Sequence, residues 1–153
     1  ANIAQIVNVL QSMILTKGKD MVLTPTYYVF KMYNVHQDAT YLPLDLNCEV
    51  MDVRDNRKVP IVSATASKDK DGKIHISMSN IDADNAQEIT INLPDVKAKK
   101  AVGEILTSAN LTDYNSFENP NNIKLAPFKE VKINKGVLKI KLPAKSIVTI
   151  ELQ

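Results

Sequence analysis

The ten residues Lys70-Asp71-Gly72-Lys73-Ile74-His75-Ile76-Ser77-Met78-Ser79 decide the fold class of this chain. The first four have the composition of a tight turn, and the residues after them alternate between apolar and polar. Because successive side chains of a strand point to opposite faces, this alternation predicts a strand with one buried and one wet face. The turn joins this strand to residues 60–67, so the two stretches together predict a β-hairpin.

The same period of two recurs after Pro43. It is carried by three apolar triplets, namely Ile89, Ile91 and Leu93; Leu138, Ile140 and Leu142; Val148, Ile150 and Leu152. A second turn, Asn134-Lys135-Gly136, joins residues 131–133 to residues 137–142 and predicts another hairpin. With residues 46–53 and 101–107 added, about eight short strands indicate a mainly β chain whose residues 44–153 form an antiparallel, jelly-roll-like β-sandwich.

Residues 1–43 have a different pattern. Five apolar residues recur at spacings of three and four and predict an amphipathic helix over residues 1–14: Ile3, Ile6, Val7, Leu10 and Ile14. The short apolar run 21–23 predicts a buried strand, and Pro25, with Thr24 or Thr26 as cap, predicts a second helix over residues 27–35 that is apolar on most faces. A lone strand between two helices has no neighbour to pair with, so this segment is interpreted as the end of a larger unit.

Composition excludes several classes of protein. The chain has 153 residues with 44% apolar and 24% charged side chains, the balance of one globular domain. The net charge of +2 has no basic focus, so neither nucleic acid nor an anionic membrane surface is predicted as a partner. One cysteine, Cys48, excludes an internal disulfide framework and leaves the compartment undecided. No apolar run of membrane-spanning length and no signal peptide is evident, and an opening at Ala1 without Met is interpreted as a processed or excised piece.

No motif predicts catalytic, metal or cofactor chemistry. The glutamates are scattered over separate predicted strands and loops: Glu49, Glu88, Glu104, Glu118, Glu130 and Glu151. A glycosidase needs two convergent carboxyls, so each is interpreted as solvated. Residues 68–72 lack most ligands of a calcium loop and are interpreted as a hairpin turn. His36 and His75 are too few for a zinc site and are predicted to face solvent. We therefore predict no catalytic residues, no cofactor and no metal ligands.

A long polar loop over residues 108–129 carries the aromatic residues Tyr114, Phe117 and Phe128 of the predicted sandwich. Loops of this length usually carry function or pack against a partner. Exposed rings are the usual stacking platforms of sugar-binding sandwiches, whereas buried rings would anchor the loop. The chain has no Trp, which disfavours a carbohydrate-binding module without excluding it.

Several ordered motifs resemble the carboxyl-terminal third of α-L-arabinofuranosidases of glycoside hydrolase family 51. The motifs are Asn2-Ile3-Ala4-Gln5, Val7-Asn8-Val9-Leu10-Gln11, Leu23-Thr24-Pro25-Thr26-Tyr27, His36-Gln37-Asp38-Ala39, Asp71-Gly72-Lys73-Ile74-His75-Ile76-Ser77, Asn80-Ile81-Asp82, Gly103-Glu104-Ile105-Leu106-Thr107, Asn115-Ser116-Phe117-Glu118-Asn119-Pro120 and Leu142-Pro143-Ala144-Lys145-Ser146-Ile147-Val148. The resemblance spans nearly the whole chain. One departure is Tyr28, where the family commonly has His.

The resemblance implies a non-catalytic piece of a larger glycoside hydrolase. Residues 1–43 would be the last helix–strand–helix of a catalytic (β/α)₈ barrel, and residues 44–153 the sandwich that packs on and stabilises it. Both catalytic glutamates of the retaining mechanism would lie outside this chain, which alone is expected to be inactive. The resemblance also implies that the sandwich lacks an early strand from the missing part. We further expect self-association through residues 1–43; the alternative is an independent carbohydrate-binding module.

Overall fold

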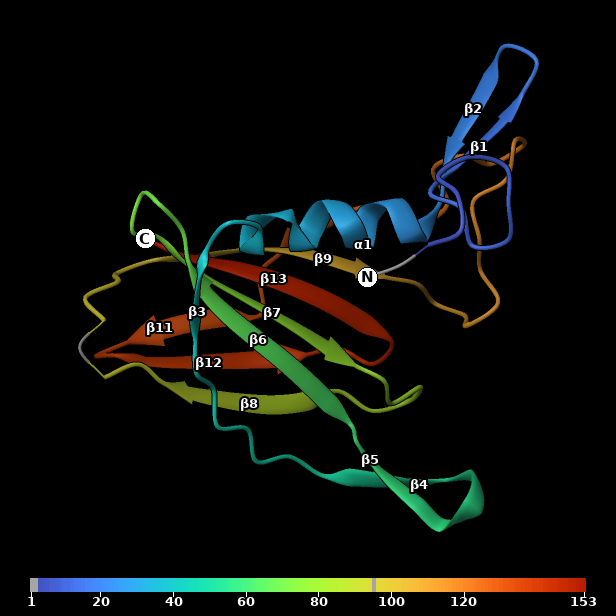
Figure 1. Cartoon of the computed structure of the whole chain (residues 1–153). Coiled ribbons are helices and arrows are strands. Elements are labelled where there is room, and N and C mark those ends of the chain that lie inside the picture. Colours follow the sequence, from blue (N-terminus) through green and yellow to red (C-terminus); the bar gives the residue numbers. More distant parts are fainter. Residues whose placement is uncertain (1–2, 95) are drawn as a thin grey trace.

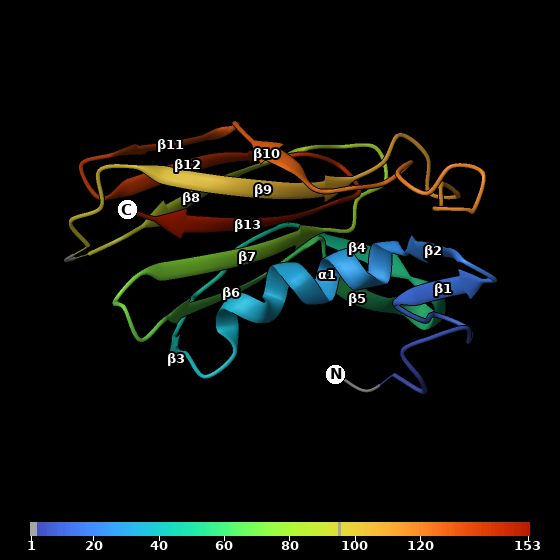
Figure 2. The ribbon, with the colours of Figure 1, turned by 90° about the horizontal axis from the view of Figure 1, so that it is seen from above.

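A computed structural model describes residues 3–94 and 96–153 of the chain. Two antiparallel sheets are stacked face to face, and one helix lies across the outer face of the larger sheet (Figures 1 and 2). Two β-hairpins project from the same end of this sandwich (Figure 1). The predicted mainly β fold with an antiparallel sandwich is therefore confirmed. Among the described residues, no helix is long and apolar enough to cross a membrane.

The larger sheet has six strands. In spatial order they are β10 (Ala126–Phe128), β9 (Ala101–Thr107), β13 (Ser146–Leu152), β7 (Ile74–Asn80), β6 (Val62–Lys68) and β3 (Thr40–Leu42). All of its pairings are antiparallel. The two edge strands are short, and the three longest pairings lie in the middle of the sheet. This arrangement places β7 and β13 at the centre of the molecule.

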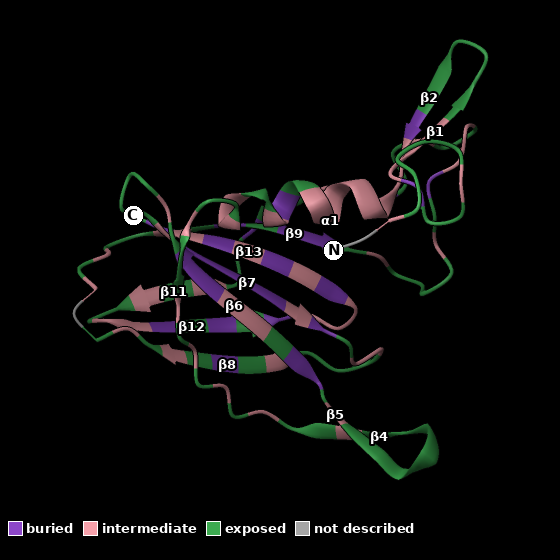
Figure 3. Ribbon diagram, viewed as in Figure 1, coloured by how far each residue is buried: buried purple, intermediate pink, exposed green. Residues whose placement is uncertain are grey.

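The smaller sheet covers the inner face of the larger one. Its strands are β11 (Val131–Asn134), β12 (Val137–Leu142) and β8 (Gln87–Asn92). Between the sheets lies the main core, whose fully buried members include Ile76, Met78, Leu138, Ile140 and Ile150. These are the apolar residues of the alternating runs, and Figure 3 shows buried positions alternating with exposed ones along β12.

Both predicted hairpins are present. The turn before β7 contains Gly72 with a φ of +84°, and the turn between β11 and β12 contains Gly136 with a φ of +75°. A positive φ is accessible to glycine at little cost, which explains why these turns form where they do. The predicted strands over residues 101–107 and 137–142 match β9 and β12 residue for residue.

The helix predicted over residues 1–14 is wrong for the described part, residues 3–14; residues 1 and 2 lie outside the described residues. Asn8 and Gln11 have positive φ values, which an α-helix does not allow. The Asn8 side chain accepts a hydrogen bond from the Thr16 backbone N–H at 2.7 Å and donates one to Thr16 Oγ1 at 2.8 Å. These side-chain bonds satisfy the backbone of the hairpin in place of a helix. The apolar spacing therefore marks no common buried face, since Ile6 and Leu10 are exposed.

The strand predicted at residues 21–23 exists, but it pairs differently from expectation. It is β2 (Asp20–Leu23), which forms an antiparallel hairpin with β1 (Ile14–Lys17). A buried parallel strand between two helices is thus absent from the described residues. The second predicted helix is instead preceded by the projecting β1–β2 hairpin, whose two strands pair with each other.

The second predicted helix is confirmed as α1 (Pro25–Tyr33), followed by the 3₁₀ turn η1 (Asn34–His36). Pro25 stands in its first turn, where the missing N–H costs nothing. Thr24 precedes it at the cap position, but its hydroxyl donates to the Ser12 carbonyl at 2.7 Å instead of capping the helix. Met32 packs against Leu106 and, with neighbouring side chains, forms a second apolar cluster between α1 and the outer face of the sheet.

The connection after α1 enters the sandwich earlier than residue 44. Strand β3 pairs with β6, so the large sheet takes one strand from the 1–43 segment. The strand predicted over residues 46–53 is reduced to β4 (Val50–Val53), which pairs with β5 (Arg57–Pro60) in the second projecting hairpin around η2 (Arg54–Asn56). The stretch before β4 runs along the core, and Leu44, Leu46 and Cys48 pack partly against it.

Candidate functional site

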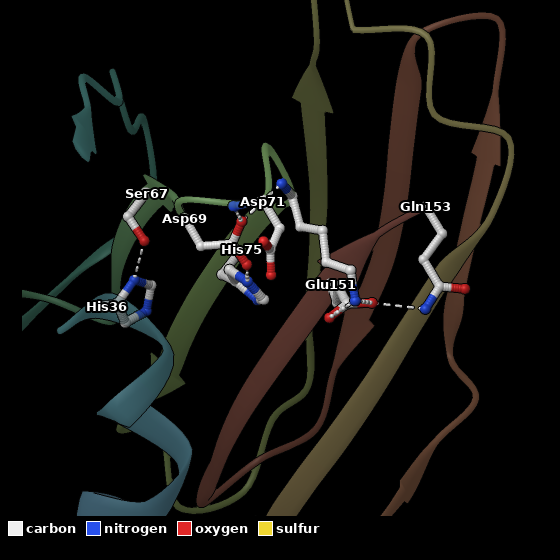
Figure 4. Close-up of polar contacts among 8 residues, drawn as sticks. His36, Ser67, Asp69, Asp71, His75, Glu151 and Gln153 are labelled. Carbon is white, nitrogen blue, oxygen red and sulfur yellow. Dashed lines mark hydrogen bonds and ion pairs between the residues drawn. The ribbon is translucent and has the colours of Figure 1, made fainter. Parts of the chain in front are cut away.

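A cluster of polar side chains lies on the outer face of the large sheet, below the C-terminal end of α1 (Figure 4). The pairing register of strands β6, β7 and β13 brings its members together. His75 on β7 stands opposite Glu151 on β13 and Ser67 on β6, and Ser77 stands opposite Thr149. These residues are the polar members of the alternating runs, so the same period that forms the core also gathers them on the other face.

His36 of η1 links the helix to this cluster. Its Nδ1 lies 2.7 Å from Ser67 Oγ and its Nε2 lies 2.8 Å from Ser77 Oγ, whose hydroxyl is also 2.9 Å from Thr149 Oγ1. A neutral imidazole has one donor and one acceptor nitrogen. We assign the proton to Nε2, because Ser67 then donates to Nδ1, and the structure gives the Ser67 hydroxyl no other acceptor among the described residues. Among the described residues, no fully buried side-chain nitrogen or oxygen lacks a hydrogen-bond partner.

The pKa of His36 is lowered from the ordinary value of 6.5, first by burial and second by the nearby His75. A lowered pKa means that the folded chain binds this proton less well than the unfolded chain does. The neutral His36 therefore contributes stability above pH 6.5, and this contribution is lost as the pH falls through that value.

His75 is buried, with 5% of its surface exposed, so the prediction that it faces solvent is wrong. Its Nε2 contacts Asp69 Oδ2 at 2.8 Å, and Asp69 Oδ1 accepts the backbone N–H groups of Asp71 and Lys73. The bond from His75, followed by these backbone bonds, lowers the pKa of Asp69. Oδ1 of Asp69 is thus used within the turn and Oδ2 by His75 on β7. The antiparallel pairing of β6 with β7 on either side confirms the interpretation of residues 68–72 as a hairpin turn. His36 is half-buried, so its prediction as solvent-facing is also wrong.

The structure brings together two glutamates that the sequence leaves apart. Glu104 and Glu151 come from the adjacent strands β9 and β13 and line one small cavity of about 280 Å³ with Lys31 and His75. Glu151 accepts bonds from Gln153 at 2.6 Å and from Lys73 at 3.2 Å, and these bonds, that from Gln153 first, lower its pKa. A glycosidase acid needs a raised pKa to hold its proton. The bonds to Glu151 lower its pKa, so they work against a role for Glu151 as the proton-donating acid.

The histidines do not form a nucleophilic triad either. Such a triad needs one histidine between a hydroxyl and a carboxylate. Here the hydroxyls of Ser67 and Ser77 contact His36, whereas the carboxylate of Asp69 contacts His75. Among residues 3–94 and 96–153, no group of three or more His, Cys, Asp or Glu side chains is placed to hold a metal ion. The arrangement fits a packing role: it buries polar side chains beneath α1 with their hydrogen bonds satisfied.

The long loop over residues 108–129 is anchored by Asn115. Its side chain donates to the carbonyls of Leu23 and Ile123 at 2.8 Å and accepts the Ile123 N–H at 2.7 Å. Of the three aromatic residues, Phe128 is buried on β10, Phe117 is half-buried and Tyr114 is 69% exposed. A single exposed aromatic ring offers a sugar little surface for stacking. The sequence offered no signal that Asn115 ties this loop to the start of α1.

Two stacked antiparallel sheets, with a polar cluster packed beneath α1, define the class of this chain as an antiparallel β-sandwich domain. A family model described as "Alpha-L-arabinofuranosidase C-terminal domain" matches residues 1–146, and the chain belongs to this family. It is 82% identical over all 153 residues to an intracellular exo-alpha-L-arabinofuranosidase of Bacteroides ovatus. It spans only 30% of that relative's length.

Solved structures agree with this assignment. The GH51 arabinofuranosidase from Xanthomonas axonopodis pv. citri has a TM-score of 0.93 and 40% identity, with 98% of this chain and 30% of that chain covered. A family 51 α-L-arabinofuranosidase from Bifidobacterium longum has a TM-score of 0.87 at 22% identity, with the same shares covered, and shows the shared fold. The resemblance read from the sequence is confirmed, and the chain corresponds to the C-terminal portion of GH51 enzymes.

Proposed function

We propose that this chain is the non-catalytic C-terminal portion of an α-L-arabinofuranosidase, in which the sandwich packs on and stabilises a catalytic (β/α)₈ barrel of the same polypeptide. The observation that carries the proposal is the family match over residues 1–146, together with the Bacteroides ovatus relative of which the chain spans 30%. The parent enzyme would remove terminal non-reducing α-L-arabinofuranosyl residues from arabinose-containing polysaccharides or oligosaccharides with retention of configuration.

We also propose that the junction with that barrel lies in residues 1–43, and that the sandwich comprises residues 44–153 together with strand β3 from the 1–43 segment. Exposed apolar side chains support this location. Most of those outside the strands lie on the segment before β1, on the 108–129 loop and just after β7: Ile6, Val7, Leu10, Leu111, Tyr114 and Ile81. Figure 1 shows the segment before β1 and the loop near one end of the sandwich, where β7 also terminates. Exposed apolar side chains that gather at one end of a domain are typical of an interaction site.

A second feature supports a missing partner from the same polypeptide. Strand β8 is an edge of the small sheet, and beside it a cavity of about 640 Å³ opens onto core residues such as Ile76, Ile91 and Leu152. An unpaired edge next to open core is the place where an additional strand would pair. This fits the expectation that the remainder of the polypeptide supplies an early strand of the sandwich.

Residues 1–153 alone are expected to show no turnover of a chromogenic α-L-arabinofuranoside, because both catalytic glutamates of the retaining mechanism would lie in the remainder of the polypeptide. A chimera in which residues 1–153 replace the matching part of the Bacteroides ovatus relative is expected to be active, since the two stretches are 82% identical. The measurements are initial rates for the fragment, the chimera and the intact relative.

Two results would contradict the proposal. One is activity that follows the isolated fragment through purification. The other is a chimera that folds, as judged by its circular dichroism, and yet has a Tm well below that of the intact relative. The second outcome would mean that the sandwich does not stabilise the barrel.

The alternative, an independent carbohydrate-binding module, has the exposed ring of Tyr114 in its favour. We expect no retardation of residues 1–153 in affinity gels containing arabinan or arabinoxylan, because the other two rings of the loop region are partly or fully buried. Tyr114→Ala and the matched helix variant Tyr27→Ala are run beside it. Retardation that disappears only in Tyr114→Ala would establish the binding module instead.

We propose further that the isolated chain forms homo-oligomers through the 1–43 segment. Leu10 and Ile6 are exposed there and would seek an apolar partner. Light scattering is expected to show assemblies larger than a monomer, with Leu10→Ser shifting the distribution to monomer. Val50→Ser, at an exposed apolar position on β4 outside this segment, is the control. A monomer at every concentration tested would rule out this mode of association.

A further inference from the structure

The C-terminal end of α1, with η1, is fastened to the sandwich differently from the rest of the helix. Tyr28, Val29 and Met32 pack against apolar side chains of the sheet and of the loop. After Tyr33 the fastening becomes polar: η1 contributes the two hydrogen bonds of His36 to buried serines. The helix therefore has an apolar anchor along its length and a polar anchor at its end.

We propose that His36 is a pH-sensitive latch, which holds η1 and the last turn of α1 on the sheet when neutral and loosens this segment when protonated. The inference concerns residues 1–153 alone and does not depend on the proposed function. Protonation adds a hydrogen to Nδ1, the atom that accepts the Ser67 hydroxyl in the assigned tautomer. Ser67 must then turn its hydroxyl hydrogen away, toward a buried region where the described residues offer it no acceptor.

The charged groups around His36 either disfavour its protonation or do not contact the ring to stabilise the added charge. On β7, His75 is the titratable neighbour whose charge disfavours a second cation. Its partner Asp69 is committed to His75 and to the turn, and Tyr33 on α1 presents a ring that is neutral at these pH values. The other charged groups lie around the adjoining cavity: Lys31 on α1, Glu104 on β9, and Glu151 on β13 with its partner Lys73. None of these carboxylates contacts the His36 ring.

The apolar anchor predicts that loosening is local. Met32 is 2% exposed and lies in the second apolar cluster, which acidification does not alter. Hydrogen exchange can resolve this difference, because the amide of Asn34 donates to the Lys31 carbonyl in the last turn of α1, and the amides of Gln37 and Ala39 donate to carbonyls of η1. Protection of these amides from exchange measures the stability of η1 on the sheet, whereas protection of the β13 amides measures the stability of the sandwich.

The test measures amide protection of residues 1–153 at pH 7.5 and pH 5.5, corrected for intrinsic exchange. Protection around η1 is expected to fall by about threefold at the lower pH, with β13 unchanged. His36→Gln is expected to have low η1 protection at both pH values. His75→Gln is expected to keep the fall but to move it to higher pH, because the neighbouring charge that lowers the pKa of His36 is gone. If η1 protection falls equally in His36→Gln and in the unaltered chain between the two pH values, the proposed latch is wrong.

An independent readout covers the case in which His36→Gln does not fold. The ring of His36 in the unaltered chain is followed by NMR through a pH titration. Titration of His36 below the value of a free histidine, concurrent with loss of η1 protection, supports the latch. If His36 titrates at or above the pKa of a free histidine, or if η1 protection does not change across the titration, the proposed latch is wrong.

Discussion

Met78→Ala is expected to lower the free energy of unfolding by about 3 kcal/mol, because it leaves a cavity at the centre of the core. Met78 is fully buried on β7, with Val148 of β13 and Ala64 of β6 as its cross-strand partners. The strands on both sides are held by long pairings, so the surrounding backbone cannot collapse into the space. Urea unfolding followed by circular dichroism measures the change.

The matched control is Met21→Ala, which removes the same side chain from an exposed position on β2. A substitution of this kind usually changes stability by less than about 0.5 kcal/mol. Equal effects of the two methionine variants would contradict the central place assigned to β7.

Asn80→Ala is expected to cost about 2 kcal/mol, because several buried backbone groups lose their partner at once. Asn80 Nδ2 donates to the carbonyls of Asn85 at 2.9 Å, Pro143 at 3.0 Å and Leu142 at 3.3 Å. Its Oδ1 accepts the Asp82 N–H at 3.0 Å. The side chain thus joins the end of β7 to the turn between β12 and β13.

Asn80→Asp separates hydrogen bonding from packing. It keeps the shape but replaces the donor with a carboxylate oxygen that faces the carbonyls, so it is expected to destabilise at least as much as Asn80→Ala. Asn121→Ala, an exposed asparagine in the 108–129 loop, is the matched control and should have little effect. If Asn80→Asp were as stable as the unaltered chain, the assigned donor role would be wrong.

The prediction of the N-terminal segment failed for an identifiable reason. The spacing of Ile6 and Leu10 satisfies a helical period, but a period becomes a helix only when its apolar stripe finds a surface to cover. In the structure Asn8, which precedes β1, instead bonds to Thr16 of β1, and both apolar residues stay exposed. A side chain eight residues away decided the outcome, and no local pattern contains that information.

In the candidate site, too, some features were predictable from the sequence and others depended on the tertiary structure. The polar faces of β7 and β13 were predictable from alternation. Which of these polar residues would be buried was not predictable. His75 and Ser77 follow the same pattern as Lys139 and Lys141 on β12, yet the first two are buried and the lysines are exposed. The difference is α1, which covers one outer face and leaves the other in water.

The sequence by itself determined the class of fold, the two hairpin turns and the family, because alternation, turn residues and ordered motifs are local properties of the chain. The tertiary structure alone decided how the N-terminal segment folds, where α1 docks and which histidine pairs with which partner. Those outcomes depend on contacts between residues far apart in the chain, such as His36 with Ser67 and Ser77. Their free energy arises only after the sheets have assembled, when the outer face of β6, β7 and β13 exists as a surface.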